Sequence, residues 1–213
     1  SKDMCLKEIK RAVGIVIRSR FKIDSSFLKE ASNIEFIARS GSGMENIDVN
    51  YCKESGIAVF NSPEGNRNAV GEHCLGLLLN LMNNISKGNH EVKSGVWDRE
   101  GNRGEELEGK TVGIIGYGHN GMSFAKKLKG FNVNVIAYDK YKKEFSNGYV
   151  KEVSLEKIFE LAHVVSFHIP QNKETKYFAN QSFFKKFKHP IYILNISRGK
   201  IINTEDLVNA IDL

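Results

Sequence analysis

Near the middle of the chain stands Val112-Gly113-Ile114-Ile115-Gly116-Tyr117-Gly118-His119-Asn120-Gly121, an apolar strand that runs directly into the pattern Gly-x-Gly-x-x-Gly. Residues 122–128 continue it with apolar positions at helical spacing. In such a strand, turn and helix, Gly116 permits the tight turn, Gly118 lets the backbone approach a pyrophosphate, and Gly121 allows close packing. The N-terminus of the helix would then face the anion.

An acidic residue stands where a ribose-binding group is expected. The next predicted strand ends immediately before Asp139, roughly 20 residues after the first glycine. Its carboxylate would accept hydrogen bonds from the adenosine ribose of NAD and repel the 2′-phosphate of NADP. Lys140, Lys142 and Lys143 stand close enough to weaken that repulsion. Together with the glycines, this acid favours a dinucleotide site with NAD as the cofactor over a glycine-rich turn without function.

The strands around this motif form two αβ series. The first series has helices that open near Asp24 and Asp48, between strands predicted at 12–17, 34–38 and 57–60. The second series has strands predicted at 111–115, 133–138, 164–167 and 191–195. A turn at residues 63–66 separates them, and a helix over 69–85 follows it. We therefore predict an α/β protein, with a Rossmann-type doubly wound parallel sheet in residues 66–213 and a smaller α/β domain in residues 1–65.

Composition narrows the class of protein. The 213 residues are 41% hydrophobic and 26% charged, as in ordinary globular proteins, and no apolar run approaches the roughly 18 residues of a membrane span. Cys5, Cys52 and Cys74 are odd in number and far apart, which predicts free thiols, no metal site and a cytoplasmic location. The net charge of +6 suits an anionic small molecule.

Three surface features have ordinary interpretations. Basic and aromatic residues mix at 140–143 and 185–189, but both stretches are short and typical of solvated surface, so we predict no binding of nucleic acid. The single tryptophan, Trp97, is expected to take part in packing rather than to contact a ligand.

A second chemical signal is Arg198, which stands just before Gly199 at the end of the last predicted strand. Ligands of doubly wound sheets bind beyond the carboxyl ends of the strands, so this arginine is aimed at the cofactor crevice. A guanidinium can grip the carboxylate and the neighbouring oxygen of a 2-oxo or 2-hydroxy acid together. A surface ion pair is the alternative, and the glycine-flanked strand end disfavours it.

Six motifs occur in the order of a known family: residues 38–48, 61–66 and 70–72, the glycine loop, His168-Ile169-Pro170, and residues 195–199. On these motifs the chain resembles the D-2-hydroxyacid dehydrogenases over nearly its whole length. The resemblance implies an NAD-dependent oxidoreductase in which an incomplete flavodoxin-like substrate domain precedes the NAD-binding domain. It also implies a homodimer, with no membrane partner.

The resemblance further implies roles for particular residues. The amides of Ser40, Gly41, Ser42 and Gly43 would bind the substrate carboxylate, and Ser42 would also lie near the nicotinamide. Arg198 would hold and polarise the substrate. The implied cofactor-binding residues are Ser42, Val70, Gly116, Gly118, His119, Asn120, Gly121, Asp139, His168, Ile169, Pro170, Ile196, Ser197 and Arg198. His119 and Asn120 depart from the arginine and isoleucine usual there, but both can donate hydrogen bonds to phosphate.

Arg18 and Arg39 indicate the substrate within that family, because they stand where its 3-phosphoglycerate-oxidising branch, which begins serine biosynthesis, holds a phosphorylated acid. Reduction of glyoxylate or hydroxypyruvate is the alternative reaction. A rival of another class is a non-catalytic, corepressor-like module that senses NAD(H).

The ends of the chain also carry an expectation. It begins with Ser1 rather than methionine and stops at Leu213, inside a helix predicted from Thr204. We expect a piece of a longer protein, without the family's first strand and without the glutamate and histidine that follow Arg198 there. Such a piece would be inactive alone, because it would lack the proton-transfer pair.

Overall fold

The structure is a computed structural model that describes residues 2–211. The chain forms two compact units, Ser1–Arg67 and Asn68–Leu213, which are described separately below. They are called unit 1 and unit 2. Within residues 2–211, no helix is both long and apolar enough to cross a bilayer.

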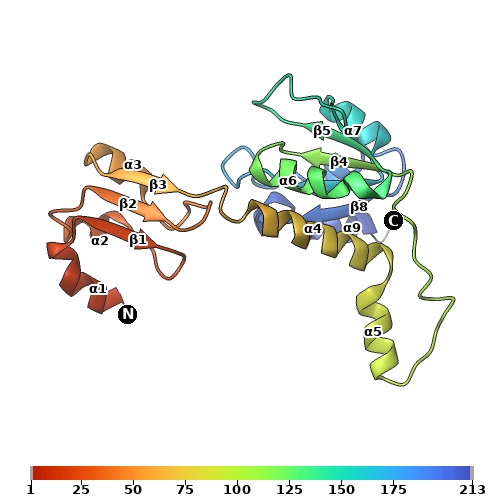
Figure 1. Ribbon diagram of the computed structural model, residues 1–213, viewed down its shortest axis with the longest axis horizontal. Helices are drawn as coiled ribbons and strands as arrows, with labels where there is room; N and C mark the ends of the chain where they lie inside the picture. Colours follow the sequence, from red (N-terminus) through yellow and green to blue (C-terminus); the bar gives the residue numbers. More distant parts are fainter. Residues whose placement is uncertain (1, 212–213) are drawn as a thin grey trace. The chain divides into compact units, whose positions relative to one another are not determined.

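Unit 1 is built on a parallel three-stranded sheet in the order β1-β2-β3 (Figure 1). Its strands are β1 (Gly14–Ile17), β2 (Phe36–Arg39) and β3 (Ala58–Asn61), and its helices are α1 (Lys2–Glu8), the 3-10 helix η1 (Ile9–Arg11), α2 (Ser25–Lys29) and α3 (Val49–Glu54). Two predicted helix starts are N-caps: Asp24 accepts a hydrogen bond from the Phe27 amide and Asp48 from the Tyr51 amide.

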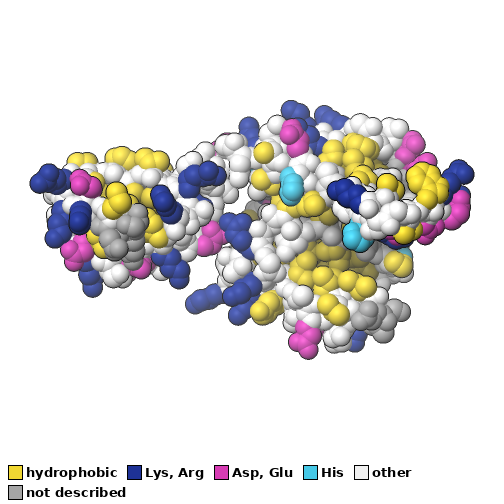
Figure 2. All heavy atoms as spheres, turned by 90° about the horizontal axis from the view of Figure 1, so that it is seen from below, with side chains coloured by type: hydrophobic (Ala, Val, Ile, Leu, Met, Phe, Trp, Pro, Cys, Tyr) yellow, Lys and Arg dark blue, Asp and Glu magenta, His cyan; other side chains and the backbone are white. Residues whose placement is uncertain are grey.

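The core of unit 1 is small and its sheet is only partly covered. Ile23, Phe27 and Ile37 are buried, whereas Val16 is 75% exposed and Phe60 is 58% exposed. Hydrophobic side chains reach the surface of both units (Figure 2). The sheet register places the ends of the three strands side by side, so whatever follows each strand gathers at one edge.

Unit 2 is built on a parallel five-stranded sheet in the order β6-β5-β4-β7-β8. Its strands are β4 (Thr111–Ile115), β5 (Asn134–Tyr138), β6 (Val150–Glu152), β7 (Val164–Phe167) and β8 (Tyr192–Asn195). The chain adds strands on one side of β4 and then returns to add β7 and β8 on the other. The strand order therefore reverses between β4 and β7, which is where α/β sheets bind ligands.

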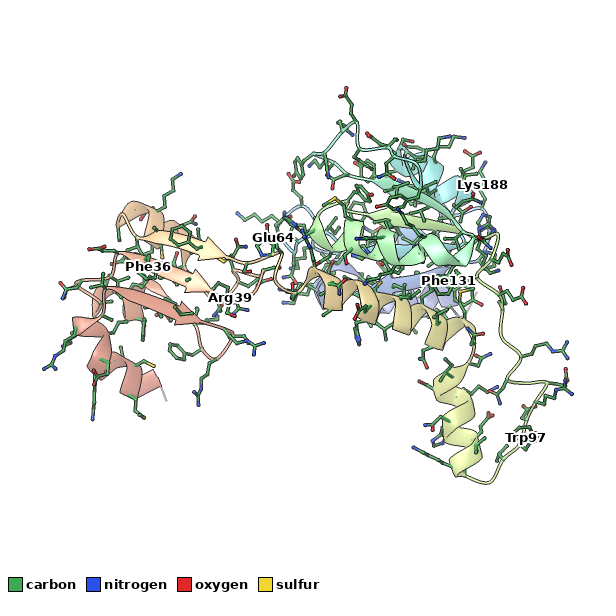
Figure 3. All side chains as sticks on the ribbon, viewed as in Figure 1. Phe36, Arg39, Glu64, Trp97, Phe131 and Lys188 are labelled. Atoms are coloured by element: carbon green, nitrogen blue, oxygen red, sulfur yellow. The ribbon has the colours of Figure 1, made fainter. Side chains whose placement is uncertain are left out.

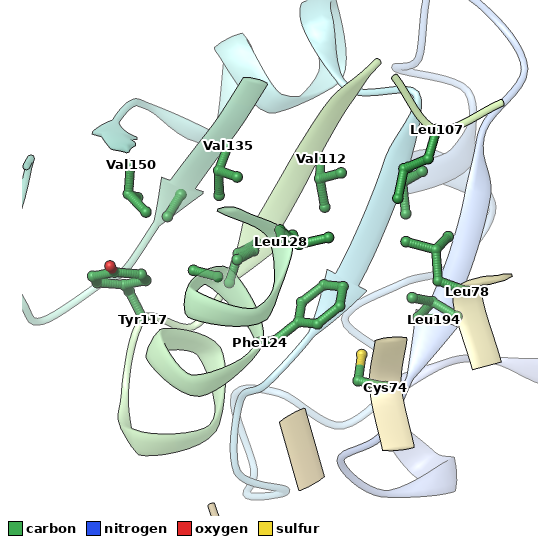
Figure 4. Packing of buried hydrophobic residues seen from close by; sticks show 14 of the residues in the cluster. Cys74, Leu78, Leu107, Val112, Tyr117, Phe124, Leu128, Val135, Val150 and Leu194 are labelled. Atoms are coloured by element: carbon green, nitrogen blue, oxygen red, sulfur yellow. The ribbon is translucent and has the colours of Figure 1, made fainter. Parts of the chain in front are cut away.

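Helices cover both faces of this sheet. The helices of unit 2 are α4 (Arg67–Met82), α5 (Ile85–Lys93), α6 (His119–Lys127), η2 (Leu128–Phe131), α7 (Leu155–Leu161), α8 (Gln181–Phe184), η3 (Gly199–Ile201) and α9 (Thr204–Ile211), and all but α5 lie close to the sheet (Figure 1). On one face, Leu78 of α4 and Phe124 of α6 pack on Val112 of β4 (Figure 4). On the other, Ile158 of α7 and Phe183 of α8 join a second buried cluster. The last two residues of the helix predicted from Thr204 lie outside the described part.

The helix predicted over 69–85 is divided into two. Asn84, at the break between α4 and α5, has a left-handed backbone with φ of 53°. Beyond it, every residue of α5 is at least partly exposed, and this helix projects from the rest of unit 2 (Figure 1). Trp97 lies in the segment after α5 and is 82% exposed (Figure 3), so the packing expected of it is not with other residues of this chain.

Candidate functional site

The glycine loop between β4 and α6 leaves little room for side chains at two of its three glycines. Gly116 has φ of +96°, and a Cβ there would lie 2.8 Å from Cγ2 of Ile169. A Cβ on Gly121 would overlap the carbonyl oxygen of Gly116. Gly118 differs, because a Cβ on it would have no described atom within 4 Å. Gly116 and Gly121 therefore shape the loop, while Gly118 leaves open space above it for a ligand.

The helix that follows begins without a side-chain cap. Gly118 is the N-cap of α6, and its carbonyl accepts the Met122 amide at 2.9 Å to close the first turn. The first-turn amides of a helix have no acceptor within the helix, and the helix dipole adds partial positive charge at that end. The loop therefore offers backbone donors beside the open space, which fits a pyrophosphate.

Asp139 braces the loop as well as lining the site. One carboxylate oxygen accepts the Tyr117 amide at 2.8 Å, and the other accepts the amides of Tyr141 and Lys142, each at 2.9 Å. A carboxylate has about four lone-pair positions, so one remains for a ribose hydroxyl. The sequence indicates the ribose contact, but not that the same side chain fixes the backbone of the glycine loop.

A pocket of about 220 Å³ lies at this edge of the sheet. It brings together six residues expected to bind the cofactor: Gly116, Gly118, Asp139, His168, Ile169 and Pro170. It also includes residues that the motifs do not indicate, among them Tyr138, Lys140, Tyr141, Asn172, Glu174 and Phe178. The other expected cofactor residues of unit 2 do not line it: Val70, His119, Asn120, Gly121, Ile196, Ser197 and Arg198.

The ring of His168 packs into the core below the pocket. It stacks on Phe124, and its Nε2 lies 2.8 Å from the hydroxyl of Ser166, which lies 3.4 Å from the Cys74 sulfur. Burial lowers the pKa of His168 to about 3 and raises the pKa of the Cys74 thiol to about 11. At neutral pH both groups are therefore uncharged: His168 is only a weak proton acceptor, and the Cys74 thiol stays protonated.

The turn that carries Arg198 is held by side chains of its own segment. Asn195 donates to the carbonyl of Arg198 at 2.9 Å and accepts the Ser197 amide at 3.1 Å. The Ser197 hydroxyl donates to the carbonyl of Phe167, the last residue of β7, at 2.9 Å. The Arg198 side chain is exposed, and Nη1 donates to the Ser197 carbonyl. Asn195, to which the motif of residues 195–199 assigns no role, positions this turn.

In unit 1, a loop of residues 40–43 follows β2 and lies beside the end of β1. The Ser40 amide donates to Ile17 and the Gly41 amide to Arg39, so these two amides already have acceptors. Within the described residues, the amides of Ser42 and Gly43 have no acceptor. The expected anion nest of four amides is thus reduced to two.

Three contacts fix the carbonyl side of that loop. Asn61 donates to the Ser42 carbonyl at 2.8 Å, the Ser62 amide to the Gly41 carbonyl at 3.0 Å, and Arg39 Nε to the Gly43 carbonyl at 3.0 Å. Arg39 lies at the end of β2 (Figure 3), and its Nη1 is buried without a partner among the described residues. An anion at the loop would satisfy that donor. Arg18 follows β1 at the same edge and is exposed.

These features define a class of protein: an α/β protein with a pocket beside a glycine loop at the strand reversal of one parallel sheet and a loop with two unused amides at the edge of another. More particularly, the chain belongs to the D-isomer specific 2-hydroxyacid dehydrogenase family. The family's NAD-binding domain matches residues 75–213, and the structure carries the glycine loop and the acid that such a domain needs.

Individual relatives agree with this placement. A D-3-phosphoglycerate dehydrogenase of Archaeoglobus fulgidus is 35% identical over 99% of this chain, and the chain spans 40% of that protein. A hydroxypyruvate reductase of Thermotoga maritima is 34% identical over 99% of the chain, which spans 68% of it. The D-lactate dehydrogenase of Aquifex aeolicus, solved with NAD and lactic acid, matches 97% of this chain and 63% of its own with a TM-score of 0.86 and 28% identity.

Proposed function

We propose that this protein takes part in the NAD-dependent interconversion of a D-2-hydroxy acid and its 2-oxo acid. The observation that carries the proposal is the pocket lined by Gly116, Gly118 and Asp139 in a member of this family. When bound, NAD would accept or supply the hydride. The open space at Gly118 and the remaining lone pair of Asp139 fit that cofactor.

The residues of unit 2 would divide the work of binding. The first turn of α6, with His119 and Asn120, would hold the pyrophosphate, and Asp139 would hold the ribose. His168, Ile169 and Pro170 would line the adenosine side. Val70, Ile196 and Ser197 would lie towards the nicotinamide, where Arg198 would grip and polarise the substrate. The N-terminus of α6 and the Arg198 side chain would supply positive charge for these anionic groups.

In unit 1, we propose that the loop of residues 40–43 binds the substrate carboxylate, with Ser42 also near the nicotinamide. Arg18 and Arg39 support a phosphorylated acid, because they bring two guanidinium groups to the edge that carries this loop. The finer proposal is therefore oxidation of 3-phosphoglycerate to 3-phosphohydroxypyruvate, the first step of serine biosynthesis. The Archaeoglobus relative supports this substrate, the Thermotoga relative supports hydroxypyruvate instead, and a glyoxylate reductase of Pyrococcus furiosus supports glyoxylate.

Two measurements test these proposals in turn. Titration with NADH and NADPH, followed by cofactor fluorescence, should show binding with a preference for NADH of about tenfold to a hundredfold. Absorbance of NADH should then be followed with phosphohydroxypyruvate, hydroxypyruvate and glyoxylate. Faster turnover of hydroxypyruvate or glyoxylate would replace the phosphoglycerate proposal. Tight NADH binding without turnover of any of them, in a full-length form of the protein, would favour the NAD(H)-sensing module.

The architecture has finer proposals too. We propose that unit 2 is a Rossmann-type doubly wound domain and that unit 1 is an incomplete flavodoxin-like substrate domain. The strand order β6-β5-β4-β7-β8 and the helices on both faces support the first, and the parallel sheet of unit 1 supports the second. The cytoplasm stays the predicted location, supported by three free cysteines.

We also propose a homodimer formed through α5 and the segment after it. Val92 of α5 is 58% exposed and Trp97 is 82% exposed, so this part of unit 2 offers apolar surface that a second copy would bury. Light scattering after size exclusion tests the proposal. The Val92→Ser variant should shift the mass towards the monomer, whereas Val208→Ser, at a 50% exposed position of α9, should not.

A further inference from the structure

Asp139 shares its pocket with a second carboxylate. Glu174 lines the same pocket and accepts two hydrogen bonds there, from Lys140 Nζ at 2.6 Å and from the Tyr141 hydroxyl at 2.8 Å. Lys140 and Tyr141 line the pocket as well, and they directly follow the acid expected to bind the ribose. Two segments far apart in sequence are thus joined across the rim of one pocket.

Glu174 is held at the rim by its own turn. Asn172 Oδ1 accepts the amides of Glu174 and Thr175, at 2.9 and 3.0 Å. The Thr175 hydroxyl donates to the carbonyl of Pro170, which also lines the pocket, at 2.5 Å. The carboxylate therefore stands on a fixed backbone, and it has less freedom to swing away than an exposed glutamate on a loose loop.

Each of the three lysines after Asp139 has a partner. Lys140 is paired with Glu174, Lys142 lies 3.5 Å from the sulfur of Met122, and Lys143 donates to the carbonyl of Asp139 at 3.3 Å. From sequence alone, these lysines are expected to weaken the repulsion between Asp139 and a 2′-phosphate. The pairing with Glu174 neutralises the lysine that lines the pocket, so the compensation is smaller than the sequence suggests.

We propose that Glu174 is a second determinant of selectivity for NAD over NADP, because it ties up Lys140 and adds a second negative charge beside Asp139. The inference rests on the proposed function, since it needs the pocket to bind the adenosine end of the cofactor. The Lys140 and Tyr141 hydrogen bonds lower the pKa of Glu174, so the group is charged at neutral pH. A 2′-phosphate at this rim meets two carboxylates and no free ammonium group from Lys140.

The test is a comparison of NADH and NADPH affinities by fluorescence titration in the Glu174→Gln variant. Glutamine keeps the size of the side chain and a carbonyl oxygen that can accept from Tyr141, while it removes the negative charge that neutralises Lys140. We expect the affinity for NADPH relative to NADH to rise about three- to tenfold. The matched control is Glu160→Gln, which removes the negative charge from another surface pair, Lys157 to Glu160 at 2.7 Å, outside the residues that line the pocket. Its ratio of affinities should stay at the wild-type value.

A second variant separates the two parts of the effect. Adding Lys140→Gln to Glu174→Gln should remove most of the gain for NADPH, because the released ammonium group is its main source. A gain that survives in the double variant would overturn the part assigned to Lys140.

The outcomes also distinguish this inference from the proposed function. Failure of the wild-type protein to bind NADH would overturn the proposed function. Normal NADH binding with an unchanged ratio in Glu174→Gln would overturn the inference alone, as would an equal loss of affinity for both cofactors, which would make Glu174 a structural brace.

Discussion

The two units place their candidate sites at the same kind of position, the carboxyl edge of a parallel sheet, but they support them differently. In unit 2 all four residues of β7 are buried, and the glycine loop follows a strand whose last four residues are buried. In unit 1 each strand has exposed residues, and loop 40–43 is held partly by the exposed Asn61. Changes in the loop of unit 2 should therefore affect folding, whereas changes in the loop of unit 1 should mainly affect binding.

The sharpest difference is expected at Gly121. Alanine there would drive a methyl group into the carbonyl oxygen of Gly116, and backbone cannot move aside as a flexible side chain can. We expect Gly121→Ala to lower the free energy of unfolding of unit 2 by about 3 kcal/mol. Chemical denaturation, read out by hydrogen exchange in each unit, measures the loss.

Two alanine variants serve as controls for that prediction. Gly118→Ala and Gly130→Ala each place a methyl group where no described atom lies within 4 Å, so both should change stability by about 0.5 kcal/mol or less. Gly118→Ala should still weaken NADH binding about tenfold, because its methyl group occupies the space of the pyrophosphate. Equal stability of the Gly121 and Gly118 variants would contradict the role of Gly121 in packing.

In unit 1 the largest effect of a substitution should be on substrate binding rather than on stability. Arg18 is exposed at the loop edge, so Arg18→Ala should leave the fold intact. If the substrate is phosphorylated, the variant should weaken the binding of 3-phosphoglycerate by roughly 1.5 to 3 kcal/mol, the value of a charge-assisted hydrogen bond. The binding of D-lactate should change far less. Steady-state kinetics with both acids give the comparison.

The matched control is Arg11→Ala, which removes the same charge from η1, before β1 rather than after it. This variant should leave the steady-state kinetics with both acids unchanged. An equal loss for 3-phosphoglycerate and D-lactate in Arg18→Ala would mean that Arg18 has a structural role, and the substrate proposal would return to the family in general.

Acid should also destabilise unit 2 more than unit 1, because all six histidines lie between residues 73 and 189. Burial lowers the pKa of His168 to about 3, below its ordinary value near 6.5, so the folded state binds fewer protons than the unfolded state. The contribution of uncharged His168 to the free energy of unfolding is therefore complete above about pH 6.5 and is lost as the pH falls towards 3. We expect unit 2 to lose about 1 to 2 kcal/mol between pH 6.5 and 5, measured by hydrogen exchange.

His163 should contribute in the same direction. Burial, His189 and Lys110 lower its pKa, and its Nδ1 accepts the Thr111 amide at 3.0 Å, a bond that protonation breaks. The His168→Gln variant should flatten most of the pH dependence, whatever its effect on stability at neutral pH. A similar loss in unit 1 over this pH range, where there is no histidine, would contradict this assignment.

Sequence predicts the buried parts of the molecule well because their signal is local. The strands β4 and β7 are mostly apolar and have the predicted bounds, and β5 and β8 begin one residue later than predicted. In unit 1, where the strands are partly exposed, β2 begins two residues late and ends one residue late. The sequence pattern does not predict β6, because Val150-Lys151-Glu152 has a single apolar residue and this short strand forms its ladder with β5.

The residues of the candidate site also differ in whether the sequence alone predicts them. The glycines, Asp139 and Arg198 follow from motifs, because each is fixed by its position relative to a strand end. Glu174 could not be predicted, because its partners lie more than 30 residues away and no pattern joins them. The reduced number of available amides in loop 40–43 also depends on folding, since the Ser40 amide is used by the neighbouring strand.

The smallest expected effect tests whether loop 40–43 is held by Asn61. This side chain donates to the Ser42 carbonyl, and it is exposed, so its loss should loosen the loop without unfolding unit 1. Asn61→Ala should weaken binding of the acid substrate about three- to tenfold and lower stability by about 1 kcal/mol or less. Asn33→Ala is a close control, because Asn33 also donates from an exposed amide to a backbone carbonyl, that of Lys10, but lies before β2 rather than at the end of β3. If calorimetry shows equal stability losses and only the Asn61 variant binds the acid more weakly, the loop of unit 1 depends on this exposed hydrogen bond for binding. If both variants bind the acid as the wild type does, loop 40–43 keeps its shape without Asn61, and the two units are more alike than their burial suggests.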